Sequence, residues 1–302
     1  MKLLILGADG MLGHKLFQVL GEVYPETYGT ISCKASAEPL NHIPFFQTDK
    51  VIPEVNSMDF QGLGKIIKLI SPDIVINCLR VATHGEETAP PLQSITVNSL
   101  LPHRLAEMTK EQGARLIHFS SDCVFDGKKG MYTEEDVPNA THDYGRTRSL
   151  GEVVADNTLV LRGSVIGREL KGSSSLLEWF LLQQGKEIKG FTRAIYSGLT
   201  SIETANVVKL ILEKTPRLTG LYNVASAPIN KYDLLKLAKE CFGVDVTIHK
   251  EEGFSVDRSL NAEKFSTATG YVAPSWSSMM KELAEEKNDF YHPVNHFFQS
   301  LF

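Results

Sequence analysis

Short apolar runs alternate with amphipathic segments along the first half of the chain. Residues 3–6 form an uninterrupted apolar run that ends at Gly7, which is typical of a parallel strand covered on both faces. An amphipathic segment with apolar residues at 12, 16, 17 and 20 follows and predicts a helix. Further strands are predicted at 27–32, 73–77, 115–120 and 159–162, with helices at 62–70, at 95–112 and after Tyr144. This alternation predicts an α/β fold with a doubly wound parallel sheet.

The alternation becomes irregular beyond residue 165. Helices are predicted at 176–181, 202–214, 231–241 and 276–285, and a strand is predicted at 244–248. We therefore expect one domain over 1–165, to which the chain returns at about 193–226, and a smaller C-terminal lobe built from 166–192 and 227–302. The end of the chain, 290–302, is unusually aromatic, and we expect it to pack on the body of the protein or on a partner subunit.

Composition excludes several classes of protein. With 42% hydrophobic and 22% charged residues, the chain is typical of a globular protein, and its net charge of -5 argues against a nucleic-acid partner. No apolar run is long enough to cross a membrane, and the run at 3–6 is too short for a signal peptide, so the cytoplasm is the expected location. The four cysteines form no CxxC pair, and no metal site is expected.

The first predicted strand leads into a loop with a glycine at every third position. Its sequence is Gly7-Ala8-Asp9-Gly10-Met11-Leu12-Gly13. Gly7 permits a tight turn, Gly10 lets backbone N–H groups approach a pyrophosphate, and Gly13 lets the following helix pack closely on the strand. The helix N-terminus adds a partial positive charge. The loop therefore predicts a Rossmann-type site for a nicotinamide dinucleotide, although a bare glycine pattern can also simply turn the chain.

The segment after the second predicted strand bears on which dinucleotide binds. A site selective for NAD usually has an acidic residue there, and this chain has none. Thr30, Ser32 and Lys34 instead offer two hydroxyls and a cation, which favours NADP with NAD as the alternative. Lys34 could also be a solvated loop charge. Asp59 could accept a hydrogen bond from the adenine amino group or could cap the next helix.

Three polar residues form a candidate catalytic group. Ser121 follows the strand predicted at 115–120, and ligands of parallel sheets meet the carboxyl ends of strands. Tyr144 and Arg148 are four residues apart, so on a helix they share one face, where the guanidinium can stabilise a tyrosine phenolate. This spacing alone is also typical of an ordinary surface pair. The position of Ser121 favours the interpretation of Tyr144 as a general acid.

Three motifs together resemble the extended short-chain dehydrogenase/reductase family, and most closely its dTDP-4-dehydrorhamnose reductase branch. They are Gly7-x-x-Gly10-x-x-Gly13, the run Ser-Ser-Asp-Cys-Val-Phe-Asp-Gly at 120–127, and Tyr144-Gly145-x-Thr147-x-x-x-Gly151-Glu152. Asn77-Cys78, the segment around Asn98, and Arg162 extend the resemblance over most of the chain. The resemblance implies an NADPH-dependent reductase of the C4 ketone of a nucleotide-linked 4-keto-6-deoxy sugar, acting in the synthesis of cell-surface polysaccharide precursors.

The resemblance also implies roles for individual residues. Tyr144 would protonate the forming alkoxide, Ser121 would hydrogen-bond the carbonyl, and Arg148 would hold the nicotinamide ribose. Asn77, Cys78 and Asn98 would lie beside the cofactor, with Asn98 supporting a proton relay. The second lobe would hold the nucleotide-diphosphate sugar. Arg258 would bind the diphosphate, and a surface salt bridge is the competing interpretation of this residue. The residues expected at the substrate are Asp122, Cys123, Val124, Arg193 and Arg258.

Two positions depart from the family pattern. Arg148 stands where the pattern Tyr-x-x-x-Lys has lysine, and a guanidinium keeps the charge but cannot pass a proton on. Leu79-Arg80 stands where small residues are common, and Arg80 could enter the cleft or point to solvent. One alternative is therefore a non-catalytic NADP-binding regulatory subunit, similar to the β subunit of methionine adenosyltransferase. A nucleotide-sugar epimerase or dehydratase is another. The quaternary state stays open, with a homodimer as one option.

Overall fold

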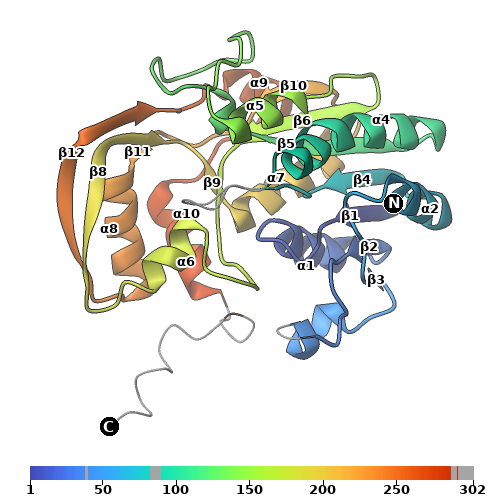
Figure 1. Cartoon of the computed structure of the whole chain (residues 1–302), viewed down its shortest axis with the longest axis horizontal. Helices are drawn as coiled ribbons and strands as arrows, with labels where there is room; N and C mark the ends of the chain where they lie inside the picture. Colours follow the sequence, from blue (N-terminus) through green and yellow to red (C-terminus); the bar gives the residue numbers. More distant parts are fainter. Residues whose placement is uncertain (38–39, 82–89, 287–290, 292–302) are drawn as a thin grey trace.

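The larger body of the protein is built on a seven-stranded sheet in the order β10-β6-β5-β4-β1-β2-β3 (Figure 1). The computed structural model describes residues 1–37, 40–81, 90–286 and 291. The strands are β1 (Leu3–Leu6), β2 (Thr27–Thr30), β3 (Val51–Ile52), β4 (Ile74–Asn77), β5 (Arg115–Ser121), β6 (Thr158–Gly163) and β10 (Gly220–Asn223), and all neighbouring pairs are parallel. The strand order reverses between β1 and β4, as in doubly wound sheets. The predicted fold class is confirmed.

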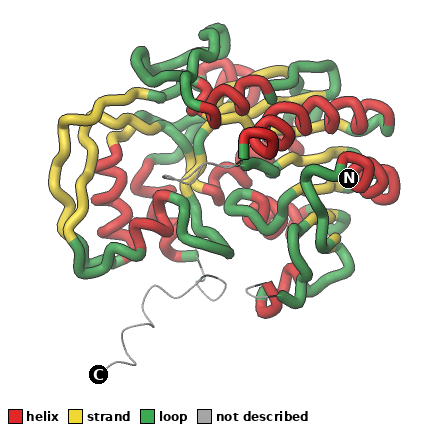
Figure 2. Tube along the Cα trace, viewed as in Figure 1, coloured by secondary structure: helices red, strands yellow, loops and turns green. Residues whose placement is uncertain are grey.

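Helices cover both faces of this sheet (Figure 2). On one face α1 (Gly13–Val23) packs on α7 (Ser201–Lys214), and on the other α2 (Phe60–Ile70) packs on α4 (Leu101–Glu111). The side chains of β1 alternate between the two cores: Leu3 and Ile5 join the first, and Leu4 and Leu6 join the second. Both faces of β1 are therefore buried, which explains why its sequence has no polar alternation.

The smaller lobe has its own three-stranded sheet in the order β11-β8-β12. Its strands are β8 (Glu187–Tyr196), β11 (Ile229–Asn230) and β12 (Thr247–Asp257), and its helices are α6 (Leu176–Leu181), α8 (Lys231–Phe242) and α10 (Trp276–Glu285). A short parallel pair, β7 (Val165–Ile166) and β9 (Leu199–Thr200), flanks β8 in the sequence, where the chain leaves the large sheet and where it returns. The chain returns to the larger body with α7 and β10. This return begins later than the expected residue 193, which lies within β8 of the smaller sheet.

The remaining helical segments lie mainly in connections. The helix predicted at 95–112 begins earlier, with α3 (Pro91–Ser94), and passes through the π-helical segment η3 (Ile95–Leu100) before α4. Single turns are η1 (Leu40–His42), η2 (Pro44–Phe46) and η4 (Asp122–Val124), and two further helices are α5 (Asp143–Leu150) and α9 (Glu263–Thr269). Of these, η4 and α5 follow the carboxyl end of β5, where the predicted catalytic residues lie.

A buried ion pair holds the carboxyl ends of β5 and β6 together. Arg162 donates from Nε and Nη2 to the two carboxylate oxygens of Glu152, at 2.8 and 2.7 Å. Ser120 donates to the same carboxylate at 2.6 Å, and the guanidinium lies over the Phe125 ring. Removal of one partner would leave the charge of the other buried and uncompensated. The pair therefore holds the ends of β5 and β6 in one arrangement.

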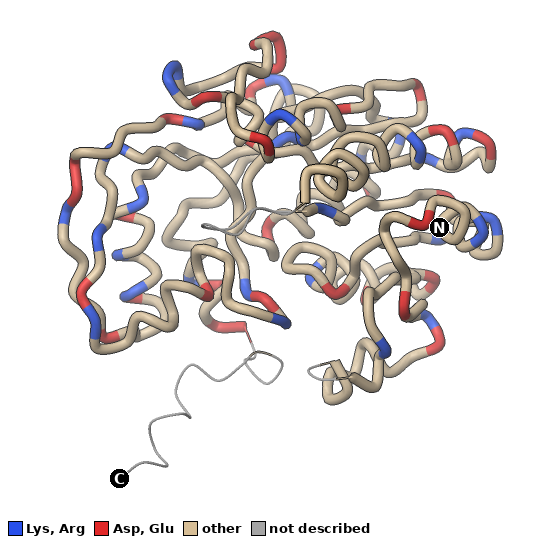
Figure 3. Tube along the Cα trace, viewed as in Figure 1, with Lys and Arg blue, Asp and Glu red and all other residues tan. Residues whose placement is uncertain are grey.

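Charged residues of both signs are interspersed over the two lobes (Figure 3). Within the described part of the chain, no helix is both long and apolar enough to cross a membrane. Among the same residues, no group of three His, Cys, Asp or Glu side chains is placed to hold a metal ion. All four cysteines are free thiols.

Tyr291, from the aromatic end of the chain, is buried against the start of α1. His14 bonds through Nδ1 to the Gly10 carbonyl at 2.9 Å and through Nε2 to the Tyr291 hydroxyl at 3.0 Å. A carbonyl only accepts, so the ring proton of His14 is on Nδ1 and Nε2 is an acceptor. The phenol proton of Tyr291 is shared between His14 and Glu286, whose Oε2 lies 3.1 Å away. The other aromatic residues of 290–302 lie outside the described residues.

Acid should destabilise the protein through His14. Burial, reinforced by the nearby Lys15, lowers the pKa of His14 from 6.5 to about 3, so between these values the unfolded chain binds a proton that the folded chain excludes. The stabilisation is therefore complete above pH 6.5 and is lost as the pH falls toward 3. Between about pH 7.5 and about pH 5, His14 should account for a loss of about 2 kcal/mol in the free energy of unfolding.

Urea denaturation at the two pH values measures this loss. The matched variant is His14→Asn, whose amide can still donate to the Gly10 carbonyl but does not titrate. The variant should lose less stability on acidification than the wild type, and equal losses in the two proteins would show that His14 is not the titrating group.

Candidate functional site

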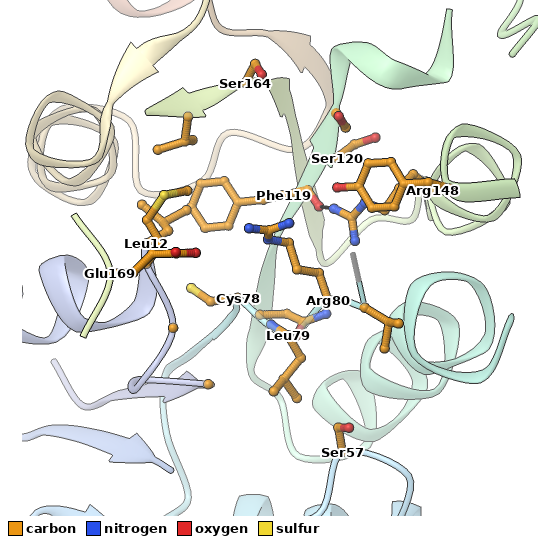
Figure 4. A pocket seen from close by; sticks show the side chains of 18 of the residues that line it. Leu12, Ser57, Cys78, Leu79, Arg80, Phe119, Ser120, Arg148, Ser164 and Glu169 are labelled. Carbon is orange, nitrogen blue, oxygen red and sulfur yellow. Dashed lines mark hydrogen bonds between the residues drawn. The ribbon is translucent and has the colours of Figure 1, made fainter. Parts of the chain in front are cut away.

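A cleft of about 830 Å³ opens at the carboxyl ends of β1, β4, β5 and β6 (Figure 4). It is lined by residues of the glycine loop after β1, by 77–81 after β4, by 119–121 of β5, by 163–165 after β6 and by 169–171. Tyr144 and Arg148 of α5 also line it. The cleft spans the point where the strand order reverses, which is where open α/β sheets bind their ligands.

The glycine loop brings α1 close to the end of β1. Gly7 has a positive φ of 81°, and a Cβ added to Gly13 would lie 1.9 Å from the Gly7 carbonyl oxygen. Only glycine fits at residue 13, therefore, without moving the helix. Leu12 precedes the helix and provides no side-chain cap. The His14 N–H already donates to the Gly10 carbonyl, so the N–H groups of Met11 and Leu12, at the wall of the cleft, are the ones that would meet an anion. This cradle fits the pyrophosphate of a dinucleotide.

The structure revises the roles expected at the end of β2. Thr30 is buried, and its hydroxyl accepts a hydrogen bond from the Gly7 N–H at 3.0 Å, so it holds the glycine loop. Lys34 is exposed and lies outside the cleft lining, as expected for a solvated loop charge. Ser32 does line the cleft. Asp59 caps α2 by accepting from the Gly62 N–H at 2.9 Å, and it too lies outside the lining.

An ion pair that sequence analysis missed closes this end of the cleft. The Asp9 carboxylate accepts from the Ser32 hydroxyl at 2.6 Å and from the Lys171 ammonium at 3.0 Å. Burial opposes ionisation, but the bonds from Ser32 and Lys171 outweigh it and lower the pKa of Asp9. Residues 9 and 171 come together only in the folded chain, and no local pattern marks the pair.

The segment after β4 forms one wall of the cleft. Asn77 is buried, its Nδ2 lies 3.1 Å from His118 Nδ1, and its Oδ1 accepts from the Leu79 N–H. Cys78 lines the cleft, and burial raises the pKa of its thiol. Arg80 extends into the pocket and is at the same time exposed to solvent (Figure 4).

Ser121 and Tyr144 are brought to the same cleft by the packing of α5 on η4. The Ser121 hydroxyl bonds to the Asp122 carboxylate at 3.2 Å and accepts from the Cys123 N–H at 3.1 Å. His142 caps α5, so that Tyr144 lies in the first helical turn. A Cβ on Gly145 would lie 2.1 Å from the Cys123 carbonyl oxygen, so glycine permits this close approach.

Arg148 is buried with unused hydrogen-bonding capacity. Its side chain is 3% exposed, and Nη2 donates to the Phe119 carbonyl. Nε and Nη1 are buried and have no hydrogen-bond partner within the described residues. Burial lowers the pKa of Arg148, and the neighbouring Tyr144 phenol partly offsets this. Because buried donors are costly without acceptors, the two nitrogens indicate a ligand with oxygen atoms at this position.

Several expected site residues instead support the cleft from behind. The Asn98 amide is fully engaged with the Val81 backbone and the Thr147 hydroxyl, at 2.8 to 3.2 Å. Val124 is part of a small buried core. Burial raises the pKa of Asp122, whose carboxylate lies behind Ser121.

The two expected substrate arginines lie outside the cleft lining as well. Arg258 donates to the Phe125 carbonyl at 3.0 Å, and Arg193 is exposed on β8. Of the five residues expected at the substrate, Cys123 lines the cleft.

One family model and several known proteins are similar to this chain. Residues 1–182 match the model described as the RmlD substrate binding domain. The chain is 27% identical over 256 residues to the "probable low-salt glycan biosynthesis reductase Agl14" of Haloferax volcanii, with 81% of each chain covered. It is 24% identical over 318 residues to dTDP-4-dehydrorhamnose reductase of Escherichia coli, covering 95% of this chain and 98% of that one. The β subunit of methionine adenosyltransferase 2 from mouse is 29% identical over 174 residues, covering 56% of this chain and 48% of the subunit.

Solved structures share the fold. A hypothetical dTDP-4-dehydrorhamnose reductase from Sulfolobus tokodaii superposes with a TM-score of 0.76 at 24% identity, covering 92% of this chain and 99% of that one. The Bacillus anthracis dTDP-4-dehydrorhamnose reductase, solved in complex with NADP, gives a TM-score of 0.74 at 19% identity, covering 94% and 99%.

Replacing Gly13 with alanine should damage both the fold and the cofactor cradle. The added Cβ would meet the Gly7 carbonyl, so we expect Gly13→Ala to lower the free energy of unfolding by at least about 2 kcal/mol. The matched control is Gly21→Ala in the same helix, where a Cβ meets nothing within 4 Å and should stabilise by about 0.5–1 kcal/mol. Urea denaturation and NADPH fluorescence titration measure the two effects, and normal NADPH binding by Gly13→Ala would contradict the assignment of the loop.

Proposed function

This chain belongs to the RmlD substrate binding domain family, and from that premise we propose that it is an NADPH-dependent reductase of a nucleotide-linked 4-keto-6-deoxy sugar. The observation that carries the proposal is the convergence of Ser121, Tyr144 and Arg148 on the cleft that the glycine loop also lines. The reaction adds hydride to C4 of the sugar and a proton to its oxygen. Its product would serve the synthesis of cell-surface polysaccharide precursors.

The cleft divides between a cofactor half and a substrate half. When bound, the dinucleotide supplies the hydride. The N–H groups of Met11 and Leu12, just before α1, would bind its pyrophosphate, and Asn77 and Cys78 would lie beside it. The two unpartnered nitrogens of Arg148 would donate to the hydroxyls of the nicotinamide ribose. NADP is the proposed cofactor, and NAD is the alternative.

Tyr144 is the proposed general acid. Its side chain is half-buried in the first turn of α5, and its hydroxyl would donate a proton to the alkoxide oxygen as C4 is reduced. Ser121 would donate to the same oxygen, which requires its proton to turn from Asp122 toward the substrate. The buried guanidinium of Arg148 would supply the counter-charge for the phenolate that remains on Tyr144 after the proton has left. A guanidinium cannot pass a proton on, so Tyr144 must recover its proton from solvent by another route.

Arg80 makes the substrate half of the cleft cationic. It lines the pocket together with Arg148, and the proximity of the two guanidinium groups contributes to lowering the pKa of Arg148. A second cation in a confined cleft favours an anionic substrate, because like charges close together are stabilised by a bound anion. A nucleotide-diphosphate sugar meets that requirement.

A non-catalytic regulatory subunit is the second candidate. It is favoured by Arg148, which keeps a positive charge but removes the proton-transferring ammonium of the family pattern. The similarity to the β subunit of methionine adenosyltransferase 2 is consistent with it, although the match covers 48% of that subunit. Such a protein would bind the dinucleotide without turning it over.

Removing the Tyr144 hydroxyl should abolish most of the reductase activity. NADPH oxidation is followed by absorbance with dTDP-, UDP- and GDP-linked 4-keto-6-deoxy sugars. Loss of the general acid should lower kcat of Tyr144→Phe by about 100- to 10,000-fold. Tyr28→Phe is the matched control, because Tyr28 lies on β2 outside the cleft lining and its hydroxyl contacts Lys50. Equal rates in wild type and Tyr144→Phe would exclude Tyr144 as the acid.

Arg148→Lys separates the reductase from the regulatory subunit. For a reductase, the wild type turns over at least one sugar of the panel, and the lysine variant remains active because the charge beside Tyr144 is kept. For a regulatory subunit, the wild type binds NADPH without turnover, and activity emerges only when lysine restores the family pattern. Fluorescence titration of NADPH with both proteins distinguishes loss of binding from loss of chemistry.

A further inference from the structure

We propose that the pair Asp9–Lys171, and not the residues of the second strand, determines how the protein distinguishes NADPH from NADH. The two residues line the cleft beside Ser32, after the second strand, where Rossmann-type domains bind the adenosine ribose, and they carry opposite charges. Lys171 would bind the 2′-phosphate of NADPH, and Asp9 would accept a hydrogen bond from the 2′-hydroxyl of NADH. This inference rests on the proposed function, because it concerns the cofactor of the same cleft.

Asp9 supplies the carboxylate that the second strand lacks. Its Oδ2 accepts from the backbone N–H and the hydroxyl of Ser32, at 3.1 and 2.6 Å, and from Lys171 at 3.0 Å. These bonds tie the glycine loop to the end of β2. All three end on Oδ2, so Oδ1 is left without a hydrogen bond inside the described part of the chain. An ionised oxygen at this place is the acceptor that an NAD site normally takes from the end of the second strand.

Lys171 reaches the same place from the loop between β7 and α6. Its ammonium donates to Asp9 Oδ2 at 3.0 Å and to Cys33 Sγ at 2.9 Å. An ammonium has three donors, so one remains for a phosphate oxygen. Burial opposes the charge, but the bonds to Cys33 and Asp9 outweigh it and raise the pKa of Lys171, which stays protonated at neutral pH. The side chain is 34% exposed, so an entering ligand can reach it.

The other candidates for the 2′-phosphate are less favourably placed. Thr30 is buried beneath the glycine loop, and Lys34 is exposed outside the lining. In Rossmann-type domains the adenosine ribose lies over the end of the second strand, which is where Ser32 lines this cleft. The Asp9 carboxylate bonds to the Ser32 hydroxyl there, and the Lys171 ammonium bonds to Cys33 Sγ.

Lys171 and Asp9 carry opposite charges. Removing the charge of Lys171 should therefore shift the preference between NADPH and NADH in the opposite direction to removing the charge of Asp9. Loss of the Lys171 cation removes a charge-assisted hydrogen bond from the 2′-phosphate and leaves the Asp9 charge to repel it. Loss of the Asp9 charge removes that repulsion and weakens the acceptor for the 2′-hydroxyl. A pair that served only to join two loops would affect both cofactors equally.

Binding measured by fluorescence titration tests the inference without relying on turnover. Dissociation constants for NADPH and NADH are determined for the wild type, Lys171→Met, Asp9→Asn and Lys34→Met, and those for 2′,5′-ADP and 5′-AMP are determined by displacement. We expect Lys171→Met to weaken NADPH and 2′,5′-ADP by about tenfold or more, with changes below about threefold for NADH and 5′-AMP. Asp9→Asn should raise the affinity for NADPH relative to the affinity for NADH. Lys34→Met should bind all four ligands like the wild type.

The outcomes separate this inference from the proposed function. Equal weakening of both cofactors by Lys171→Met, or a selective loss of NADPH in Lys34→Met, would overturn the role of the pair while leaving a dinucleotide site in place. A wild type that binds neither dinucleotide would overturn the proposed function and, with it, the inference. Opposite shifts in Lys171→Met and Asp9→Asn would establish the pair as the specificity determinant.

Discussion

The close approach of α1 to the end of β1 is the constraint on which the cleft depends. Gly13 lies so near the Gly7 carbonyl that no side chain fits between them, and the uncapped start of the helix is thereby placed at the wall of the cleft. The buried neutral ring of His14 fixes the same turn by bonding to the Gly10 carbonyl on one side and Tyr291 on the other. A residue near the end of the chain thus supports the loop that would bind the pyrophosphate.

The substitution of arginine for lysine in the Tyr-x-x-x-Lys pattern has consequences that the structure makes visible. Arg148 is nearly inaccessible to solvent, anchored to the Phe119 carbonyl, and has two donors unused within the described residues. The guanidinium can therefore hold charge and position a ribose, while proton return must follow another route. Arg80 adds a second positive charge to the same cleft, so the site is suited to an anionic substrate.

Much of the large domain could be predicted because its signals are local. The apolar run 3–6, the glycine spacing and the four-residue spacing of Tyr144 and Arg148 correspond directly to β1, the loop and α5. The end of the cleft at Asp9 and Lys171 could not be predicted, because these two residues meet only through folding and Thr30 points beneath the loop. In the smaller lobe, β8 went unpredicted and only the start of β12 was expected, since much of each strand is exposed and lacks regular apolar alternation.

The reductase assignment is tested most directly by following the transferred hydrogen. The protein is incubated with NADPH that carries deuterium at the transferring position of the nicotinamide and with the 4-keto sugar that it accepts. Mass spectrometry and proton NMR then locate the label in the product. A reductase that reduces the C4 ketone should place one deuterium on C4 of the sugar. A product without deuterium, or with deuterium at another carbon, would contradict the assignment.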